Sequence, residues 1–205
     1  MHSANDFPFP LVPHMYFGFQ LLIPDPISMK EIYEREKFDF PYWSKIWPSA
    51  LAMSEWIMQQ PELIRGLNVM EIGAGIGLPS FVSSKYAKNI IVTDQQQNAL
   101  DLINININLN HIQNMSSAKT DWQSDQIIPA EIYLLSDVNY EPGSIGSLQN
   151  MIVEIMNAGG KICLSTPQRI TAIAFVEFLK PYVLMSYIRD ADSTPISLYL
   201  LGKKG

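Results

Sequence analysis

The sequence predicts an α/β protein built on a doubly wound sheet of seven mostly parallel strands. Three observations carry this prediction. Seven short apolar segments alternate with segments of helical pattern, which is typical of a doubly wound sheet. A glycine-rich turn, V-M-E-I-G-A-G-I-G at 69–77, directly follows one apolar segment. The next apolar segment, N-I-I-V-T-D at 89–94, ends in an acid at the edge where open α/β sheets bind ligands.

Length and composition indicate one domain. The 205-residue chain is 47% hydrophobic, which is ample for a single large core. We therefore expect one domain over residues 1–205, in which residues 1–48 form an N-terminal extension or lid and residues 49–205 form the core.

Charge, cysteine content and hydropathy argue against several classes of partner. The net charge is −6, with 14 Lys and Arg against 20 Asp and Glu, whereas phosphate binding needs a basic face. The one cysteine, Cys163, lies in the apolar run K-I-C-L-S and is expected to be a buried thiol. No run approaches a membrane span, and residues 1–25 lack the pattern of a signal peptide. We expect cytoplasmic residence and no nucleic-acid, membrane or metal partner.

The extension is expected to be ordered but irregular. It holds half of the 14 prolines, interleaved with aromatic and apolar residues, and disordered tails are poor in such residues. Residues 16–23 are predicted to form an edge strand or a hairpin arm, and residues 29–37 a short helix. Such an extension usually covers part of the core.

The core elements follow in alternation. A helix is predicted from Pro48 to Gln60, with the proline near its first turn. Strands are predicted at 67–72, 89–94, 115–120, 131–136, 160–165, 182–189 and 196–202. Further helices are predicted at 78–87, 96–110, 145–157 and 170–180.

One of these helices is predicted against its own periodicity. Ile103, Ile105 and Ile107 alternate with asparagines, a period of two that indicates a strand. The segment lies between two strands that need a crossover, however, and a parallel connection almost always requires a helix. Several of its residues also fall at helical spacing, so we predict a helix.

The turn after the first core strand has the form of a nucleotide-binding loop. Gly73, Gly75 and Gly77 let the chain turn sharply and let its backbone approach a ligand closely. A dinucleotide site would need its last glycine one residue later, where Leu78 stands. A strand-to-helix turn without a ligand is the alternative.

Asp94 ends the second core strand, so its carboxylate is expected at the ligand-binding edge of the sheet. A carboxylate at this position can accept both hydroxyls of a ribose. Enzymes that bind NAD use the same device, so Asp94 does not by itself distinguish between cofactors. A helix N-cap is the alternative role, and the two roles are compatible.

With Glu71 two residues ahead of Gly73, the turn reads E-x-G-x-G-x-G and looks like motif I of the class I S-adenosylmethionine-dependent methyltransferases. The resemblance implies a Rossmann-like fold with an antiparallel last strand, and S-adenosyl-L-methionine as the cofactor. It assigns Glu71, Gly73, Gly75 and Gly77 to the cofactor site, and it implies the ribose role for Asp94.

The segment P-Y-W-S-K-I-W-P-S-A-L-A-M-S-E-W-I at 41–57 narrows the resemblance. It is similar to the Trp-Pro-Ser/Gly-Ala/Gly segment of the seven-β-strand protein-lysine methyltransferases, in which the tryptophan that matches Trp47 lies against the cofactor. Burial in the core is the alternative for Trp47, and it is the expected role of Trp43 and Trp56.

Asp121 and Trp122 follow the third core strand, where this family carries Asp-Trp beside the adenine of the cofactor. A carboxylate can accept a hydrogen bond from the adenine amino group, and an aromatic side chain can line its ring. An exposed Asp at the start of a loop is the alternative.

The end of the fourth core strand, L-L-S-D-V-N-Y at 134–140, resembles the Asp-x-x-Tyr motif of the same family. The resemblance implies that Asp137 and Tyr140 are catalytic and that Ser136 contacts the cofactor. The two intervening residues are not prolines, which argues against methylation of a nucleic-acid base. A capping Asp with a packing Tyr is the alternative. A weaker match places Arg169 near the substrate, although a solvated charge at a helix start is favoured there.

The resemblance covers roughly residues 41–169 and implies methyl transfer from S-adenosyl-L-methionine to a protein lysine. Asp137 and Tyr140 would orient the amine in line with the sulfonium methyl group. A methyltransferase for a small-molecule amine or other metabolite is one alternative, and a non-catalytic module that binds S-adenosylmethionine is another. The first 40 residues match nothing in the family.

Overall fold

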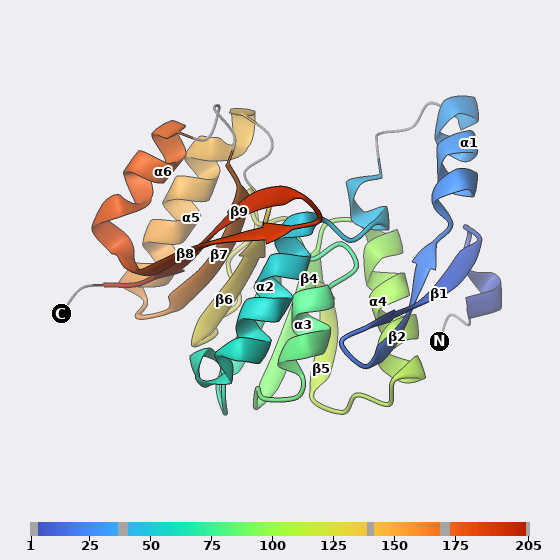
Figure 1. Ribbon diagram of the computed structural model, residues 1–205, viewed down its shortest axis with the longest axis horizontal. Coiled ribbons are helices and arrows are strands. Elements are labelled where there is room, and N and C mark those ends of the chain that lie inside the picture. The colour runs from blue at the N-terminus through green and yellow to red at the C-terminus, as the bar shows by residue number, and fades with distance from the viewer. Residues whose placement is uncertain (1–3, 37–40, 139–141, 169–172, 204–205) are drawn as a thin grey trace.

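The computed structural model describes residues 4–36, 41–138, 142–168 and 173–203. Within them, seven strands form one sheet with helices on both faces, and a two-stranded hairpin lies at one side of the molecule (Figure 1). The predicted Rossmann-like α/β fold is confirmed. No helix in this part of the chain is long and apolar enough to cross a membrane.

The strand order in the large sheet is β5-β4-β3-β6-β7-β9-β8. The strands are β3 (Asn68–Ile72), β4 (Asn89–Asp94), β5 (Met115–Lys119), β6 (Ile132–Ser136), β7 (Lys161–Pro167), β8 (Val183–Ala191) and β9 (Thr194–Leu201). The first five in this order pair in parallel, and β9 runs antiparallel to both of its neighbours. The predicted strands agree with these to within two residues at each end.

The chain winds outward in both directions from the pair β3 and β6. β3 pairs with β4 on one side and with β6 on the other, and both pairings are parallel. The connection after β3 leads to β4 on one side of this pair, and the connection after β6 leads to β7 on the other side. Open α/β sheets form ligand sites at the carboxyl ends of strands where the connections separate in this way. The fold therefore brings the loops after Ile72, Asp94 and Ser136 to one edge.

Helices cover the two faces of the sheet unequally. α2 (Pro48–Gln59), α3 (Leu78–Ser83) and α4 (Gln97–Leu109) pack on one face, and α5 (Ile145–Asn157) and α6 (Ile173–Leu179) pack on the other. Side chains alternate between the two cores along each strand, as a period of two requires. Val69 and Leu134 enter the first core, whereas Met70 and Leu135 enter the second.

Two predicted helices differ from the observed ones in length. α3 ends at Ser83, four residues before the predicted end, because the N–H groups of Lys85 and Tyr86 bond to carbonyls three residues back instead of four. α6 begins at Ile173, and the predicted start at residue 170 lies outside the described residues.

The N-terminal extension forms a hairpin and a helix. The hairpin strands are β1 (Leu11–Tyr16) and β2 (Phe19–Pro24), and α1 (Pro26–Glu36) follows. The hairpin arm predicted over residues 16–23 is present as β2, but it starts three residues later than predicted, because the turn falls at residues 17–18. Phe17 and Gly18 have φ values of 50° and 86°, the left-handed pair of a two-residue hairpin turn. α1 starts three residues before its predicted start, since Asp25 caps it by accepting the Ser28 N–H at 2.9 Å.

The alternating Ile and Asn segment is a helix, as predicted, and its asparagines explain the unusual pattern. Asn106 pairs its side-chain amide with the backbone of Leu22, accepting the N–H at 2.8 Å and donating to the carbonyl at 3.0 Å. Asn110 does the same with Gln20, at 3.1 and 2.8 Å. Two side-chain amides one helical turn apart thus make hydrogen bonds with the backbone groups on the outer edge of β2, as a neighbouring strand would. α4 is therefore buried against both the sheet and the hairpin.

Candidate functional site

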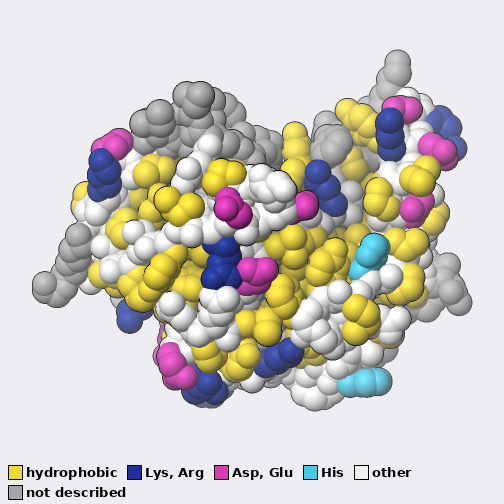
Figure 2. Space-filling view, in the orientation of Figure 1, with side chains coloured by type: hydrophobic (Ala, Val, Ile, Leu, Met, Phe, Trp, Pro, Cys, Tyr) yellow, Lys and Arg dark blue, Asp and Glu magenta, His cyan; other side chains and the backbone are white. Residues whose placement is uncertain are grey.

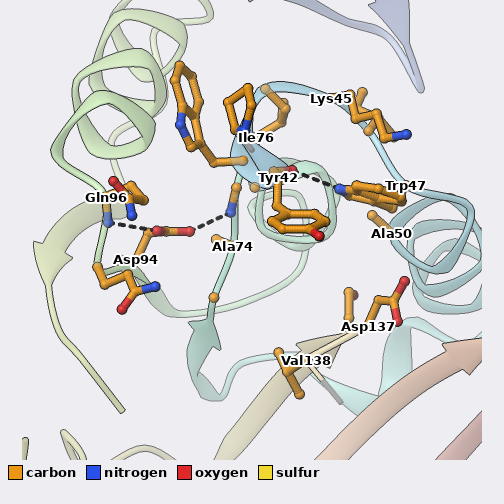
Figure 3. A pocket seen from close by; sticks show the side chains of 18 of the residues that line it. Tyr42, Lys45, Trp47, Ala50, Ala74, Ile76, Asp94, Gln96, Asp137 and Val138 are labelled. Atoms are coloured by element: carbon orange, nitrogen blue, oxygen red, sulfur yellow. Dashed lines mark hydrogen bonds between the residues drawn. The ribbon is translucent and has the colours of Figure 1, made fainter. Parts of the chain in front are cut away.

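A cavity of about 870 Å³ opens at the carboxyl ends of β3, β4 and β6. Sites for small molecules usually enclose about 300–1,000 Å³. Figure 3 shows Asp94 and Gln96 on one side of this cavity and Trp47 and Asp137 on the other. The remaining lining residues come from the N-terminal segment, from the segment before α2, from the glycine loop, and from the segments after β4, β5 and β6. They include Phe9, Tyr42, Trp43, Lys45, Gln95, Asn98, Trp122, Gln123, Ser136, Val138 and Ser144.

The glycine loop forms one wall of the cavity. Gly73, Gly75 and Gly77 line it and have φ values of 65°, 56° and 76°, which favour glycine at all three positions. At Gly75, the close approach that the missing Cβ permits is to another part of the chain. Such a Cβ would lie 3.3 Å from both the Cα and the carbonyl oxygen of Trp43. Gly75 therefore allows the chain before α2 to pack on the loop.

Asp94 is 7% exposed, yet it lines the cavity. Its Oδ2 accepts the N–H of Gly75 at 2.9 Å, and its Oδ1 accepts the N–H of Gln96 at 2.8 Å (Figure 3). Burial raises the pKa of this carboxyl, and the hydrogen bonds from the backbone partly offset that effect. Each carboxylate oxygen has a second lone pair, so the carboxylate can fix the loop and still accept from a ligand.

Glu71 lies beneath the loop and is not among the residues that line the cavity. It is 1% exposed, and its Oε2 accepts the N–H of Ser80 in the first turn of α3 at 3.0 Å. Burial raises the pKa of Glu71 to about 8. The acid of the E-x-G-x-G-x-G pattern thus holds the start of α3 in place rather than facing the cavity.

Trp47 lies at the cavity and immediately precedes α2. Its indole Nε1 donates to the carbonyl of Tyr42 at 2.8 Å, and the two rings lie 6.0 Å apart. The ammonium of Lys45 lies 3.7 Å from the centroid of the Trp47 ring, a close cation–π contact. Trp56 is a core residue, as expected, whereas Trp43 is buried and also contributes to the cavity wall.

The loop after β5 brings Trp122 and Gln123 to the cavity but not Asp121. The carboxylate of Asp121 accepts the N–H of Gln123 at 3.0 Å, and the N–H of Asp121 donates to the carboxylate of Asp125 at 2.8 Å. Asp121 therefore shapes the turn that presents its two successors.

Asp137 and Ser136 line the cavity where β6 ends. Asp137 is 8% exposed and has a φ of 57°, the left-handed region that Asp tolerates better than most residues. Its N–H donates to the carbonyl of Ser165 on the next strand at 2.9 Å. A left-handed, buried acid at the carboxyl end of a strand is the kind of backbone feature found at functional sites. The second predicted catalytic residue, Tyr140, and Arg169 lie outside the described residues.

Sequence reasoning missed several residues of the cavity. Phe9 lies far from the motifs in sequence, and no local signal marks it. Tyr42 and Lys45 stand next to Trp47 in the recognised segment, and Gln95 follows Asp94 directly, so proximity to a predicted site residue was the available signal.

A family model described as lysine methyltransferase matches residues 33–181, which is more than half of the chain. The chain belongs to this lysine methyltransferase family. The match includes the glycine loop, Asp94 and the end of β6, and it begins after the hairpin.

Two curated relatives of this family member share about a quarter of the aligned residues. The electron transfer flavoprotein beta subunit lysine methyltransferase of Xenopus laevis is 24% identical over 167 residues, which cover 78% of this chain and 65% of the relative. The histone-arginine methyltransferase METTL23 of Mus musculus is 25% identical over 128 residues, 59% of this chain and 51% of the relative. The chain thus spans between about half and two thirds of the length of these relatives.

Solved structures of methyltransferases share the fold. Trm5b from Pyrococcus abyssi superimposes with a TM-score of 0.67 at 16% identity, covering 96% of this chain and 57% of that one. The tRNA (uracil-54, C5)-methyltransferase of the same organism, in complex with S-adenosyl-L-homocysteine, gives a TM-score of 0.62 at 11% identity over 93% and 44% of the two chains. At these identities the likeness concerns the fold alone.

S-adenosyl-L-methionine is the cofactor of this methyltransferase family. The cavity residues of this family member fit it chemically. Asp94 offers a buried carboxylate for hydroxyl groups, Trp122 offers an aromatic face, and the glycine loop offers backbone without side chains.

Proposed function

We propose that this protein transfers a methyl group from S-adenosyl-L-methionine to the amine of a protein lysine. The observation that carries the proposal is that one cavity combines the glycine loop and Asp94 with a second carboxylate, Asp137, and an aromatic face, Trp47. The Trp47 ring already has a lysine ammonium, that of Lys45, at 3.7 Å. An aromatic ring with a carboxylate in the same cavity suits an amine that becomes a methylated ammonium.

The cofactor is proposed to span the cavity along the edge of the sheet. Asp94 would accept the ribose hydroxyls, and Trp122 would line the adenine with support from Gln123. Gly73 to Gly77 would pack against the methionine part, and Ser136 would contact it from the end of β6. Glu71 and Asp121 would act through the loops that they fix rather than by direct contact, because neither lines the cavity.

The reaction is an in-line displacement at the sulfonium carbon. The lysine nitrogen forms a bond to the methyl carbon as the carbon–sulfur bond breaks, the sulfur keeps that electron pair, and S-adenosyl-L-homocysteine leaves. The chain must supply orientation, an effect that can contribute about 7–11 kcal/mol at best. Entry into a partly desolvated cavity lowers the pKa of the amine and so favours its neutral, nucleophilic form. Asp137 would accept an amine N–H and thereby aim the lone pair at the methyl group.

A protein acceptor also agrees with the charge of the chain. The net charge is −6, which favours a cationic side chain over a nucleic acid as the acceptor. On the face in Figure 2, acidic and basic side chains are interspersed rather than gathered by sign. We therefore propose a protein partner and no nucleic-acid partner.

The proposal is tested with S-adenosyl-L-methionine that carries a tritiated methyl group. The purified chain is incubated with it and a cell extract, and the products are separated by size before the protein fraction is hydrolysed. Label on methyl-lysine is the expected result. Label on methyl-arginine would favour the chemistry named for the METTL23 relatives, and label confined to small molecules would favour a metabolite acceptor.

A matched pair of variants tests the role of Asp137 in the same assay. Asp137→Asn keeps the shape and the left-handed backbone but removes the charged acceptor, and we expect most methyl transfer to be lost while affinity for S-adenosyl-L-homocysteine stays within a few-fold. Asp192→Asn is the control, because Asp192 also has a left-handed backbone, with a φ of 49°, but is exposed in the turn between β8 and β9. Equal activity in the two variants would remove Asp137 from the mechanism.

A further inference from the structure

An aromatic cluster near the N-terminus reaches the cavity. The ring centroids of Phe7 and Phe9 lie 5.9 Å apart, those of Phe7 and Trp43 6.3 Å apart, and those of Phe9 and Trp43 5.8 Å apart. These separations are typical of stabilising aromatic pairs. Phe7 and Trp43 are buried, whereas Phe9 is half-buried and lines the cavity.

Trp43 extends this cluster to the glycine loop. Its backbone lies against Gly75, since a Cβ at Gly75 would be 3.3 Å from the Cα and the carbonyl oxygen of Trp43. The N–H of Gly75 donates to Oδ2 of Asp94 at 2.9 Å. A continuous series of contacts therefore joins Phe9 to the carboxylate proposed to bind the ribose.

The hairpin holds the segment that carries Phe9. The carbonyl of Pro10 accepts the N–H of Asp25 at 2.8 Å, which closes the open end of the hairpin next to Phe9. At its other end, Lys85 donates to the carbonyl of Phe17 at 2.6 Å. The bond from Lys85 and those from the asparagines of α4 fix the hairpin on the core. The family match begins at residue 33, so Phe9 and the hairpin lie outside the matched region.

We propose that Phe9 is a positioning residue of the cofactor site, through which the N-terminal segment sets the affinity for S-adenosyl-L-methionine. Its ring braces Trp43 against the glycine loop and forms part of the cavity wall. Removal of the ring lets Trp43 and the loop relax and opens the wall to water, so cofactor contacts weaken even though Phe9 is remote from the motifs. The inference rests on the cofactor site proposed above.

Two matched truncations test the proposal. Phe9→Ala is compared with Phe178→Ala, because Phe178 is also half-buried and also has two ring neighbours, Phe175 at 6.4 Å and Tyr182 at 5.7 Å, but lies outside the cavity. Calorimetry with S-adenosyl-L-homocysteine measures affinity, and thermal unfolding measures stability. We expect both variants to lose stability, and only Phe9→Ala to lose affinity, by about tenfold.

A conservative variant separates positioning from packing. Phe9→Leu keeps most of the apolar bulk but not the ring, so it should lower affinity by about threefold, less than Phe9→Ala, whereas Phe178→Leu should leave affinity unchanged. If Phe9→Ala does not fold, Phe9→Leu and Phe178→Leu provide the same comparison. Unchanged affinity in the folded Phe9 variants would overturn this inference alone. Failure of the unaltered chain to bind S-adenosyl-L-homocysteine would overturn the proposed function and this inference with it.

Discussion

Asp94 has two tasks at once, because it holds the glycine loop by its bond to the Gly75 N–H and faces the cavity. Asp94→Ala should lower the affinity for S-adenosyl-L-homocysteine by roughly one to two orders of magnitude, since a hydrogen bond to a charged group contributes about 1.5–3 kcal/mol. Calorimetry on the folded protein measures this. Asp101→Ala on α4, outside the cavity lining, is the control. A loss of stability with unchanged affinity would reduce Asp94 to a loop-fixing residue.

Glu71 makes stability depend on pH in a defined direction. Burial raises its pKa from 4.5 to about 8, so between these pH values the folded state keeps a proton that the unfolded state has released. The free energy of unfolding therefore falls as pH rises through this window, by at most about 1.4 kcal/mol per pH unit. Glu71→Gln removes this dependence and keeps an oxygen that can accept the Ser80 N–H.

Urea unfolding of the two proteins at pH 5, 6, 7 and 8 measures the effect of Glu71. The Gln variant should gain stability relative to the unaltered chain as pH rises. Burial also raises the pKa of Asp94, which makes stability fall with rising pH in the same way. Both proteins contain Asp94, so its contribution largely cancels in the difference between their free energies of unfolding. A difference that is constant across this range would show that Glu71 does not titrate there.

At the scale of elements, the docking of β2 on α4 depends on side-chain amides instead of a strand partner. Asn106→Ala leaves the N–H and carbonyl of Leu22 without their partner at a part-buried position, which should cost about 1–3 kcal/mol in the free energy of unfolding. Asn108→Ala, an exposed position on the same helix, should change it by no more than about 0.5 kcal/mol. Urea unfolding measures both. Equal effects would mean that the amide pairing contributes no net stability.

The two-sided burial of α4 explains why periodicity alone would have predicted a strand over Ile103 to Leu109. A helix that is buried on one face shows apolar residues at a period of 3.6, whereas α4 is buried against the sheet and against the hairpin. Apolar and amide side chains therefore occur on more than one face, and a period of two results. The need for a crossover between parallel strands gave the right element.

At the scale of the molecule, the cavity is bordered by three parts of the chain that are far apart in sequence: the N-terminal segment, the segment before α2, and the loops of the sheet edge. A ligand that contacts all three should stabilise the folded state as a whole. S-adenosyl-L-homocysteine at a hundred times its dissociation constant should add about 2.7 kcal/mol, which corresponds to a rise in Tm of roughly 5–10 °C. Differential scanning calorimetry measures this rise, and NAD at the same concentration is the control. Protection by NAD alone would overturn the cofactor assignment.

The sequence by itself determined the elements, their order and the class of site. β-branched runs, glycines on alternate positions and an acid at a strand end are signals carried by neighbouring residues, and their structural consequences are local. Because the carboxyl ends of parallel strands meet at one edge, placing Gly73 to Gly77, Asp94 and Asp137 in order along the chain was enough to bring them to one cavity.

Only the tertiary structure decided which side chains face that cavity and what covers it. Glu71 and Asp121 belong to the recognised motifs, but their carboxylates accept backbone N–H groups, those of Ser80 and Gln123, and neither residue lines the cavity. Phe9 belongs to no motif, yet it lines the cavity wall. The turn at Phe17 and Gly18 and the pairing of Asn106 with Leu22 were equally invisible in the sequence. Such choices depend on packing between segments tens of residues apart, and a side chain turns toward a ligand or toward the backbone according to partners that local patterns do not encode.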